Sequence, residues 1–336
     1  MTVEKATPTV NTNLTDDELT VAYTGKAIEG YDEAEATAAN VVAEAKQPTG
    51  DITYTFYTDP ECSDENKVTN GGGKDGNIPI AVGTYYMKAT YPGDKNYTSA
   101  ESEPVTVTVT KAQLTVDAEG YEGTYEGETH SAITIKSVTG NGTTLAQGQY
   151  TVKYAKTNTN IAPGADADVW QNTLITVKDV ADSTSGSQYY WYKVQDTAGN
   201  YEPKIEQVNV SITPAALKPN NVPDSYSKTY DGDDGVETDL TGITVTGIFT
   251  EPISVTATGT YDNENADKDK TVTLTLTLSG TDGANIDWGN YSYNDQALTD
   301  GQITLTQTGA GTITPKAITV TGISAENRVY DGTTDV

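Results

Sequence analysis

The feature of this sequence that most constrains its fold is an internal repeat with a period close to 100 residues. Tyr-x-Gly opens each repeat, at intervals of 102, 105 and 100 residues: Tyr23-Thr24-Gly25, Tyr125-Glu126-Gly127, Tyr230-Asp231-Gly232 and Tyr330-Asp331-Gly332. Two further markers keep nearly the same period, a closing signature at 110–114, 213–217 and 314–318 and an Asn-Tyr dipeptide at 96–97, 200–201 and 290–291. Three markers with one period indicate a true repeat rather than chance.

A period of this length predicts separate domains. Solenoid units span roughly 20 to 50 residues, so a longer repeat is expected to bury its own core. We therefore expect domains at 1-112, 113-215 and 216-317, and the truncated start of a fourth at 318-336.

Short alternating runs predict that each domain is a β-sandwich. The clearest runs are Ile52–Tyr57, Thr84–Ala89 and Val105–Val109, with turn residues such as Gly71-Gly72-Gly73 between them. The chain has 22 Tyr but two Phe and two Met, which favours half-buried pleated surfaces over helix bundles. The prediction is an all-β fold of tandem immunoglobulin-like β-sandwiches in an elongated head-to-tail array.

One segment has helical character. Asp32 with Glu35 would form a capping box ahead of an Ala/Glu-rich stretch that ends near Lys46. The aligned position in the repeat favours a strand around Val41-Val42 instead, and the helix is the alternative.

The junctions between repeats are short. The closing strand at 105–110 runs almost directly into Leu114-Thr115-Val116, and 313–315 runs into Ile318-Thr319-Val320. At roughly 3.3 Å per strand residue, three such domains would form a rod on the order of 100 Å. We expect these junctions to restrict hinge motion.

The charge excludes several partners. With 48 acidic and 20 basic residues, the formal charge is −28. Duplex binding needs a basic surface, so no nucleic acid partner is expected, and anionic membranes are disfavoured for the same reason. No apolar run long enough for membrane insertion is present, and self-repulsion favours a monomer.

Catalytic residues are scarce, and we predict that the chain is not an enzyme. His130 is the only histidine and lacks a Gly-x-Ser-x-Gly partner motif. Cys62 is the only cysteine, and its acidic neighbours are expected to raise its thiol pKa. The many carboxylates are spread evenly, as expected of solvated faces.

Calcium is the best cofactor candidate, although none is expected to be required. Zinc is disfavoured because the chain has one Cys and one His. Asp231, Asp233 and Asp234 form one loop of hard oxygen ligands, and the acids from Asp262 to Asp269 form another. Neither loop matches the twelve-residue calcium pattern, so solvated turns are the competing interpretation.

The aromatic run Tyr189, Tyr190, Trp191 and Tyr192 is the best candidate ligand patch. In a strand, Tyr189 and Trp191 share one face, and Tyr190 and Tyr192 share the other. One pair is expected in the core. The other pair either stacks on a sugar or protein partner or pairs across strands.

The third repeat resembles the bacterial immunoglobulin-like repeats that are named for their Tyr-Asp-Gly motif. The matching segments are Lys228–Gly232, Gly259–Asn263, Gly289–Tyr291 and Gly311–Ala317, and the pattern restarts at Arg328–Thr334. The first repeat is similar to a sister group of mostly bacterial repeats through Tyr23–Lys26, Gly83–Tyr85 and Gly93–Tyr97. The second resembles bacterial modules with a Val-x-Asp-x-Ala-Gly-Asn turn, here at 194–200.

This resemblance implies a secreted or surface-displayed bacterial protein, with anchoring signals outside this fragment and no catalytic residues to transfer. The expected function is a structural spacer or stalk that holds a distal module away from the cell. The alternative is an adhesive or carbohydrate-binding module, whose partner would be a host or cell-surface protein or polysaccharide. An intramolecular Lys-Asn crosslink, as in some Gram-positive surface sandwiches, stays open.

Overall fold

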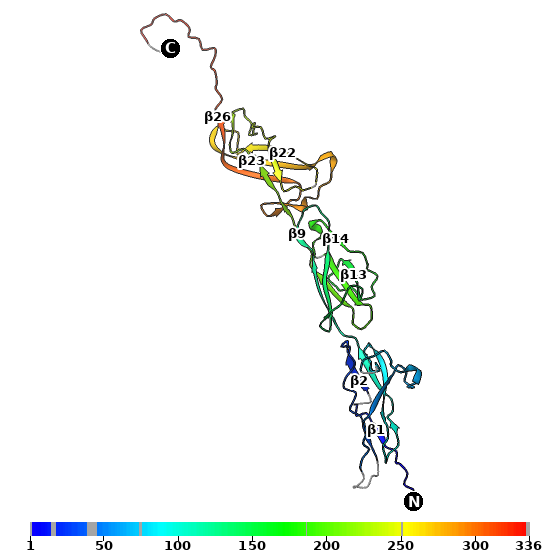
Figure 1. Cartoon of the computed structure of the whole chain (residues 1–336). Helices are drawn as coiled ribbons and strands as arrows, with labels where there is room; N and C mark the ends of the chain where they lie inside the picture. The colour runs from blue at the N-terminus through cyan, green and yellow to red at the C-terminus, as the bar shows by residue number, and fades with distance from the viewer. Residues whose placement is uncertain are drawn as a thin grey trace. The chain divides into compact units, whose positions relative to one another are not determined.

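A computed structural model describes residues 2–14, 18–38, 46–73, 76–185, 187–249 and 251–333, and these form an all-β protein of tandem immunoglobulin-like domains (Figure 1). The helical elements among the described residues are short 3-10 turns: η2 (Asp64–Asn66), η3 (Val180–Asp182), η4 (Thr281–Gly283) and η5 (Trp288–Asn290). The predicted all-β fold class is therefore confirmed, and the elongated arrangement stays a prediction.

The first repeat is built around one mixed sheet. Its strand order is β2 (Glu18–Ala22), β7 (Val105–Thr110), β5 (Gly83–Tyr91) and β4 (Thr53–Tyr57), with β6 (Ala100–Glu101) paired to β5. A second ladder joins β1 (Thr9–Asn11) to β3 (Glu35–Thr37). Strands β2 and β7 are parallel, so the first strand of the sheet closes against the last. Val105, Val107 and Val109 alternate with threonines and pack on Phe56 and Met87, which are 0% exposed.

The second repeat has two three-stranded sheets. One orders β12 (Thr143–Thr144), β11 (Ile133–Gly140) and β8 (Leu114–Gly120), and the other orders β13 (Tyr150–Thr157), β15 (Tyr189–Asp196) and β16 (Lys204–Val208). A short ladder pairs β10 (His130–Ser131) with β14 (Thr176–Val177). Strands β9 (Glu122–Thr124) and β17 (Ser211–Thr213) also pair.

The third repeat is dominated by long strands. The main sheet orders β20 (Tyr226–Thr229), β26 (Gln302–Thr314), β23 (Asp267–Gly280) and β22 (Ile253–Tyr261), and Figure 1 shows the last three side by side. In a smaller sheet, β24 (Tyr291–Tyr293) lies between β18 (Ala215–Ala216) and β25 (Gln296–Ala297) and pairs with both. A separate ladder pairs β19 (Lys218–Asn220) with β21 (Thr244–Thr246).

Period-two burial builds the core of the main sheet. In β23, Val272, Leu274, Leu276 and Leu278 are at most 2% exposed, and the threonines between them face the other side. Each fully buried aliphatic side chain of this kind contributes about 1.5–3 kcal/mol.

Most strand predictions are confirmed, and two segments differ. The three alternating runs become β4, β5 and β7, and 114–116 begins β8. The proposed helix is wrong at Glu35–Thr37, which is a strand, while 39–45, including Val41-Val42, lies outside the described residues. Residues 318–320 form no strand because no neighbouring strand pairs with them.

Contacts divide the chain into two compact units. The first contains Met1–Glu122, His130–Val177 and Asp182–Ser211, and the second contains Gly123–Thr129, Lys178–Ala181 and Ile212–Val336. The predicted boundary at residue 112 lies inside the first unit, so the three-domain division stays a prediction. No helix in the described part of the chain is both long and apolar enough to span a membrane.

We predict that Leu276→Ala will destabilise the chain by about 2–5 kcal/mol, because it leaves a cavity at a 0% exposed position of β23. Thr258→Ala, at an exposed position of β22, is the matched control and should change stability little. Urea unfolding measures both. Equal midpoints for the two variants would contradict this account of the core.

Candidate functional site

The aspartates of the Tyr-Asp-Gly loop surround a lysine ammonium. Lys228 Nζ lies 2.9 Å from Asp231 Oδ1 and donates to the carbonyls of Asp233 and Gly235, each at 3.1 Å. The Lys228 side chain is 1% exposed, whereas Asp234 is exposed. An internal cation thus already binds Asp231, one of the three calcium candidates, and the backbone carbonyl of a second, Asp233.

The second acidic loop is arranged in the same way. Lys270 Nζ lies 2.8 Å from Asp262 Oδ1 and 2.9 Å from Asn263 Oδ1, and its side chain is 3% exposed. Across the described residues, no group of three His, Cys, Asp or Glu side chains converges as metal ligands would. Bound ammonium groups disfavour a divalent cation at both loops because the charges repel and the oxygens are taken.

These pairs shift the pKa values of their members. Burial alone would lower the pKa of Lys228, but the hydrogen bond to Asp231 and its charge outweigh that effect and raise the pKa. The same hydrogen bond lowers the pKa of Asp231, and Lys270 lowers that of Asp262. In both loops the neighbouring lysine therefore favours the charged form of the aspartate.

The aromatic run does not form an exposed patch. Tyr190, Trp191 and Tyr192 are 0%, 6% and 2% exposed, and Tyr189 is half-buried. Both faces of β15 are covered, and the polar atoms find partners: Tyr190 donates to Asp182 O at 2.6 Å, Trp191 Nε1 to Thr157 Oγ1 at 3.0 Å and Tyr192 to Glu206 Oε2 at 2.7 Å. Burial, with the nearby charge of Asp182, raises the pKa of Tyr190 to about 12. Three of the four rings of the candidate ligand patch therefore lie in the core.

His130 and Cys62 are not brought together with a catalytic partner set in the described structure. The His130 ring stacks on Tyr121, with centroids 4.1 Å apart and planes at 14°. Cys62 is buried, and burial, more than the acidic neighbours invoked from the sequence, raises the pKa of its thiol. A raised thiol pKa opposes the thiolate that nucleophilic chemistry requires.

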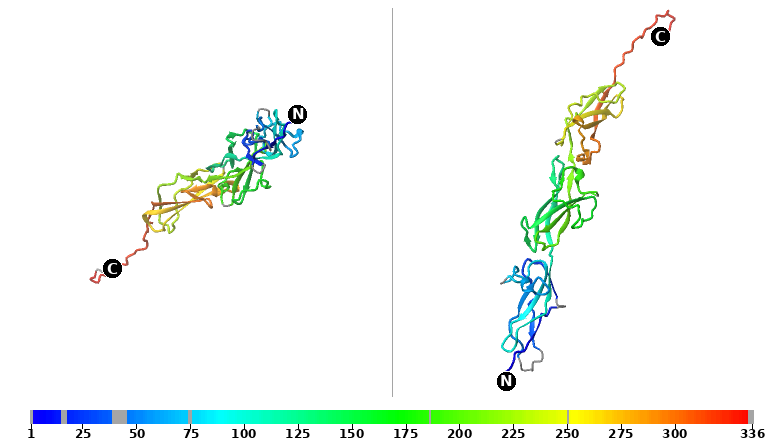
Figure 2. Two further views of the ribbon diagram at one scale, coloured as in Figure 1. Left: turned by 90° about the horizontal axis from the view of Figure 1, so that it is seen from below. Right: turned by 90° about the vertical axis from the view of Figure 1, so that its right-hand side faces the viewer.

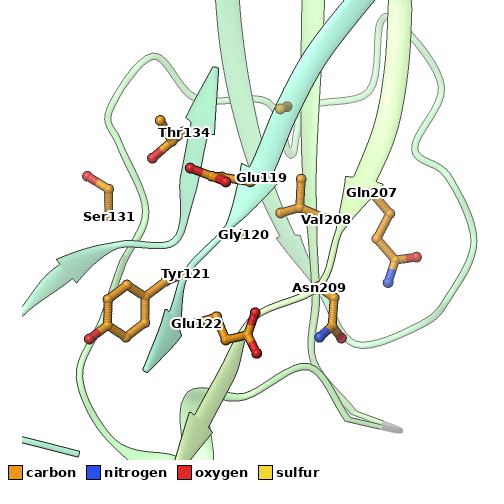
Figure 3. A pocket seen from close by; sticks show the side chains of 10 residues that line it. Glu119, Gly120, Tyr121, Glu122, Ser131, Thr134, Gln207, Val208 and Asn209 are labelled. Carbon is orange, nitrogen blue, oxygen red and sulfur yellow. The ribbon is translucent and has the colours of Figure 1, made fainter. Parts of the chain in front are cut away.

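A groove of about 590 Å³ lies on the second repeat, and Figure 3 shows residues of β8, β16, β10 and β11 in its lining. Glu119, Glu122, Gln207 and Asn209 supply polar side chains to it. Glu119 is bound by Lys136 at 2.5 Å, so the two glutamates are not a free acid and base pair. The groove is lined mostly by polar residues.

The best-defined group of interacting side chains lies instead where the first two repeats meet. It consists of Tyr23, Asn141 and Tyr201, and we call it the first junction cluster. The two tyrosine rings meet edge to face, with centroids 5.3 Å apart and planes at 87°. Asn141 Nδ2 donates to Tyr23 O at 3.0 Å and to the Tyr201 hydroxyl at 3.4 Å. Asn141 has a φ of 49°, a left-handed conformation that Asn tolerates.

Backbone pairing and glycine packing support this cluster. Ala112 N donates to Asn200 O at 3.1 Å, and Val82 N donates to the Asn200 side chain at 3.1 Å. The Tyr201 ring lies so close to Gly140 that an added Cβ there would approach a ring carbon to 2.3 Å. Glycine at 140 is therefore what lets the ring reach the junction.

Within the second unit, a homologous set forms the second junction cluster: Tyr125, Glu251 and Tyr291. The rings again meet edge to face, at 5.5 Å and 77°. Both hydroxyls donate to Glu251, Tyr125 to Oε1 and Tyr291 to Oε2 at 2.5 Å. Tyr125 and Tyr291 are 2% and 0% exposed.

The Asn of the Asn-Tyr dipeptide is used in the same way at both places. Val180 N donates to Asn290 Oδ1 at 2.8 Å, as Val82 N does to Asn200, and Asn290 Nδ2 donates to Asp179 Oδ1 at 2.9 Å. Ala215 pairs in parallel with Tyr291, as Ala112 does with Tyr201. Two of the three periodic markers of the sequence, Tyr-x-Gly and Asn-Tyr, are thus the two halves of one contact.

Hydrogen bonding fixes the charge of Glu251. Burial alone would raise its pKa, but the two tyrosine hydroxyls that donate to it hold the pKa below its usual range. Burial and Glu251 together raise the pKa of both tyrosines. Neither Glu251 nor Asn141 was singled out from the sequence, because neither recurs with the period of the repeat.

Comparison with known proteins identifies part of the chain. Residues 213–298 match the YDG domain family, which confirms the resemblance of the third repeat; the resemblances of the first two repeats stay predictions. No curated protein is similar enough in sequence to count as a relative.

Solved structures with tandem domains are also similar. The three N-terminal domains of the bacteriophage RB49 outer capsid protein Hoc are 12% identical, with 93% of this chain and 99% of that chain covered and a TM-score of 0.25. Mouse cadherin-23 EC22-24 is 14% identical (92% and 99% covered, TM-score 0.26), and Drosophila N-cadherin EC1-4 is 10% identical (93% and 76% covered, TM-score 0.23). Likeness at this level carries no argument about function.

We predict that Lys228→Met will destabilise the chain by about 2–3 kcal/mol, because it removes charge-assisted hydrogen bonds from a buried position. Lys67→Met removes an ammonium from Asp64 in a solvent-exposed pair and should change stability little. Denaturant unfolding compares the two. Similar small losses would show that the buried ammonium has no special structural role.

We predict that Glu251→Gln will weaken the pH dependence of stability. Because the folded pKa of Glu251 is lowered, its contribution is present above the unfolded value of about 4.3 and is lost as the pH falls through the folded pKa. The gap in urea midpoint between parent and variant should be widest near neutral pH and close in acid. A gap that stays constant down to about pH 3 would contradict the carboxylate's role.

We predict that Gly140→Ala will destabilise the chain by about 1–3 kcal/mol, because the new methyl group displaces the Tyr201 ring. Gly164→Ala is the control, since a Cβ there meets nothing within 4 Å. Thermal unfolding of both variants measures the difference. If both behave alike, the ring does not depend on the bare glycine.

Proposed function

We propose that this chain is a non-catalytic structural spacer of a secreted or surface-displayed bacterial protein. It holds a distal module away from the cell, and its junction clusters keep neighbouring repeats from hinging freely. The observation that carries the proposal is the paired use of Tyr-x-Gly and Asn-Tyr at both junctions.

The residues that make up the second compact unit support this role. Residues Gly123–Thr129 and Lys178–Ala181 come from the second repeat in sequence, yet their contacts place them with Ile212–Val336. Hinges between domains need boundaries that few contacts cross. Here two loops of one repeat are integrated into the contacts of the next.

The interaction energies within each junction cluster are large enough to restrict hinge motion between neighbouring repeats. An edge-to-face aromatic pair contributes about 0.5–1.5 kcal/mol, and each hydrogen bond about as much again. A cluster of this size favours the closed junction by a few kcal/mol, which leaves open states at roughly 0.1–10%. Open junctions would then be a minor population.

The chemistry of the chain agrees with a passive role outside the cell. The charge of −28 keeps the surface soluble and self-repelling, and one buried cysteine needs no reducing compartment. The rival role, ligand binding through the aromatic run, loses its main support because those rings are buried.

Small-angle X-ray scattering of the whole chain tests the proposal. The spacer account predicts a profile that a single rigid arrangement fits, with a maximum dimension that a calcium chelator does not change. A Tyr125→Ala, Tyr201→Ala double variant should require a flexible ensemble, while Thr115→Ala, at an exposed position of β8, should not.

Two results would contradict it. A parent profile that matches an ensemble of freely hinged domains and equals that of the double variant would remove the junction clusters as stiffening elements. A profile that changes on chelation would restore calcium as a structural cofactor.

A further inference from the structure

We infer that the far end of the third repeat, at Tyr230, is a docking surface for the Asn-Tyr end of another repeat of this kind, namely the one that begins at residue 318. This inference rests on the proposed function and extends it. It assigns a partner to a surface that the two described junctions leave open.

Tyr230 is placed like the tyrosines of the two junction clusters. Its backbone N–H donates to Thr314 O at 2.8 Å, as that of Tyr23 does to Thr110 and that of Tyr125 to Thr213, each at 2.8 Å. The backbone at the end of each repeat is therefore the same, and each presents a tyrosine in the same position.

The three tyrosines differ in what covers them. Tyr125 is 2% exposed beneath Tyr291 and Glu251, whereas Tyr230 is 38% exposed. In the two other repeats the equivalent tyrosine meets a tyrosine of the repeat that follows, Tyr23 with Tyr201 and Tyr125 with Tyr291. Tyr230 therefore marks the place where a following repeat would pack.

The connecting segment is uncovered as well. At the described junctions, the residues after the closing threonine pair with the next Asn-Tyr, as Ala112 and Ala215 do. After Thr314, the apolar residues Ile318 and Val320 alternate with polar ones and are 86% and 69% exposed, and Ile323 beyond them is 82% exposed; Figure 2 shows this segment (red) leaving the third repeat without a strand beside it. The pattern is that of a strand without its sheet.

The segment that follows identifies the partner. Arg328 binds Asp331 Oδ1 at 2.9 Å, as Lys228 binds Asp231, and Thr333 N donates to Asp331 Oδ1 at 3.0 Å, as Asp233 N donates to Asp231. The opening loop of a Tyr-Asp-Gly repeat is thus already formed here by local contacts. The occupant of the Tyr230 surface is the repeat that this loop opens, in continuation of the interface used twice before.

A duplicated repeat of known sequence tests the assignment. Residues 318–336 are replaced by a second copy of 217–317, so that a second Glu251 and Tyr291 follow Ala317 in the aligned position. Every protein in this test carries Cys62→Ser. One pair of spin labels has one label in the third repeat and the other in the added copy. A second pair spans the second and third repeats, and pulsed electron spin resonance gives both distance distributions.

The inference predicts two narrow distributions. Tyr230→Ala should broaden only the distribution to the added copy, Tyr125→Ala only the distribution across the second junction, and Thr258→Ala neither. A broad distribution to the added copy beside a narrow one across the second junction would overturn this inference and leave the proposed function intact. Two broad distributions would overturn both.

Two further measurements test whether the added copy folds and whether something else occupies the Tyr230 surface. If calorimetry shows that the added copy does not fold, residues 114–215, which carry Asn200 and Tyr201, replace it with the same expectations. Sedimentation velocity of the unmodified chain tests a second copy as occupant. Concentration-dependent association that Tyr230→Ala abolishes would overturn the assignment to a repeat in the same chain.

Discussion

The edge-to-face contact between two tyrosines, one from each of two neighbouring repeats, is the interaction on which the account of this chain depends. Each repeat has its own strands and buried side chains, but these explain only why it folds. The tyrosine pairs explain how one repeat contacts the next. In each pair, the tyrosine of a Tyr-x-Gly motif meets the tyrosine of an Asn-Tyr dipeptide. At the first junction the side-chain amide of Asn141 donates hydrogen bonds to both tyrosines, and at the second the carboxylate of Glu251 accepts hydrogen bonds from both.

Internal cations are the second constraint. Calcium would be an ordinary way to order acidic loops, but Lys228 and Lys270 place ammonium groups among the oxygens of the two most acidic turns. The ion pairs and hydrogen bonds of these ammonium groups supply order that a bound metal would otherwise supply. In the proposed spacer, the Lys-x-Tyr-Asp-Gly motif is therefore a structural element in its own right.

Periodicity made much of this predictable. Period-two alternation located β4, β5 and β7, and the recurrence of Tyr-x-Gly and Asn-Tyr located the repeats. Sequence spacing did not reveal that these two markers touch, because the contact joins residues about 170 positions apart (for example Tyr125 and Tyr291). Glu251 could not be predicted because it has no counterpart in the other repeats. Alternation in β15 predicts which side chains share a face of the strand, but it does not show that both faces are buried.

The most direct test is nitrogen-15 NMR relaxation of the whole chain, which reports how each repeat tumbles. If the junction clusters couple the repeats, amides in the strands of all three will share one anisotropic rotational diffusion tensor. Three separate correlation times, each expected of a domain of about 100 residues, would show that the repeats move independently. That result would contradict the central claim that paired tyrosines make this chain a stiff spacer.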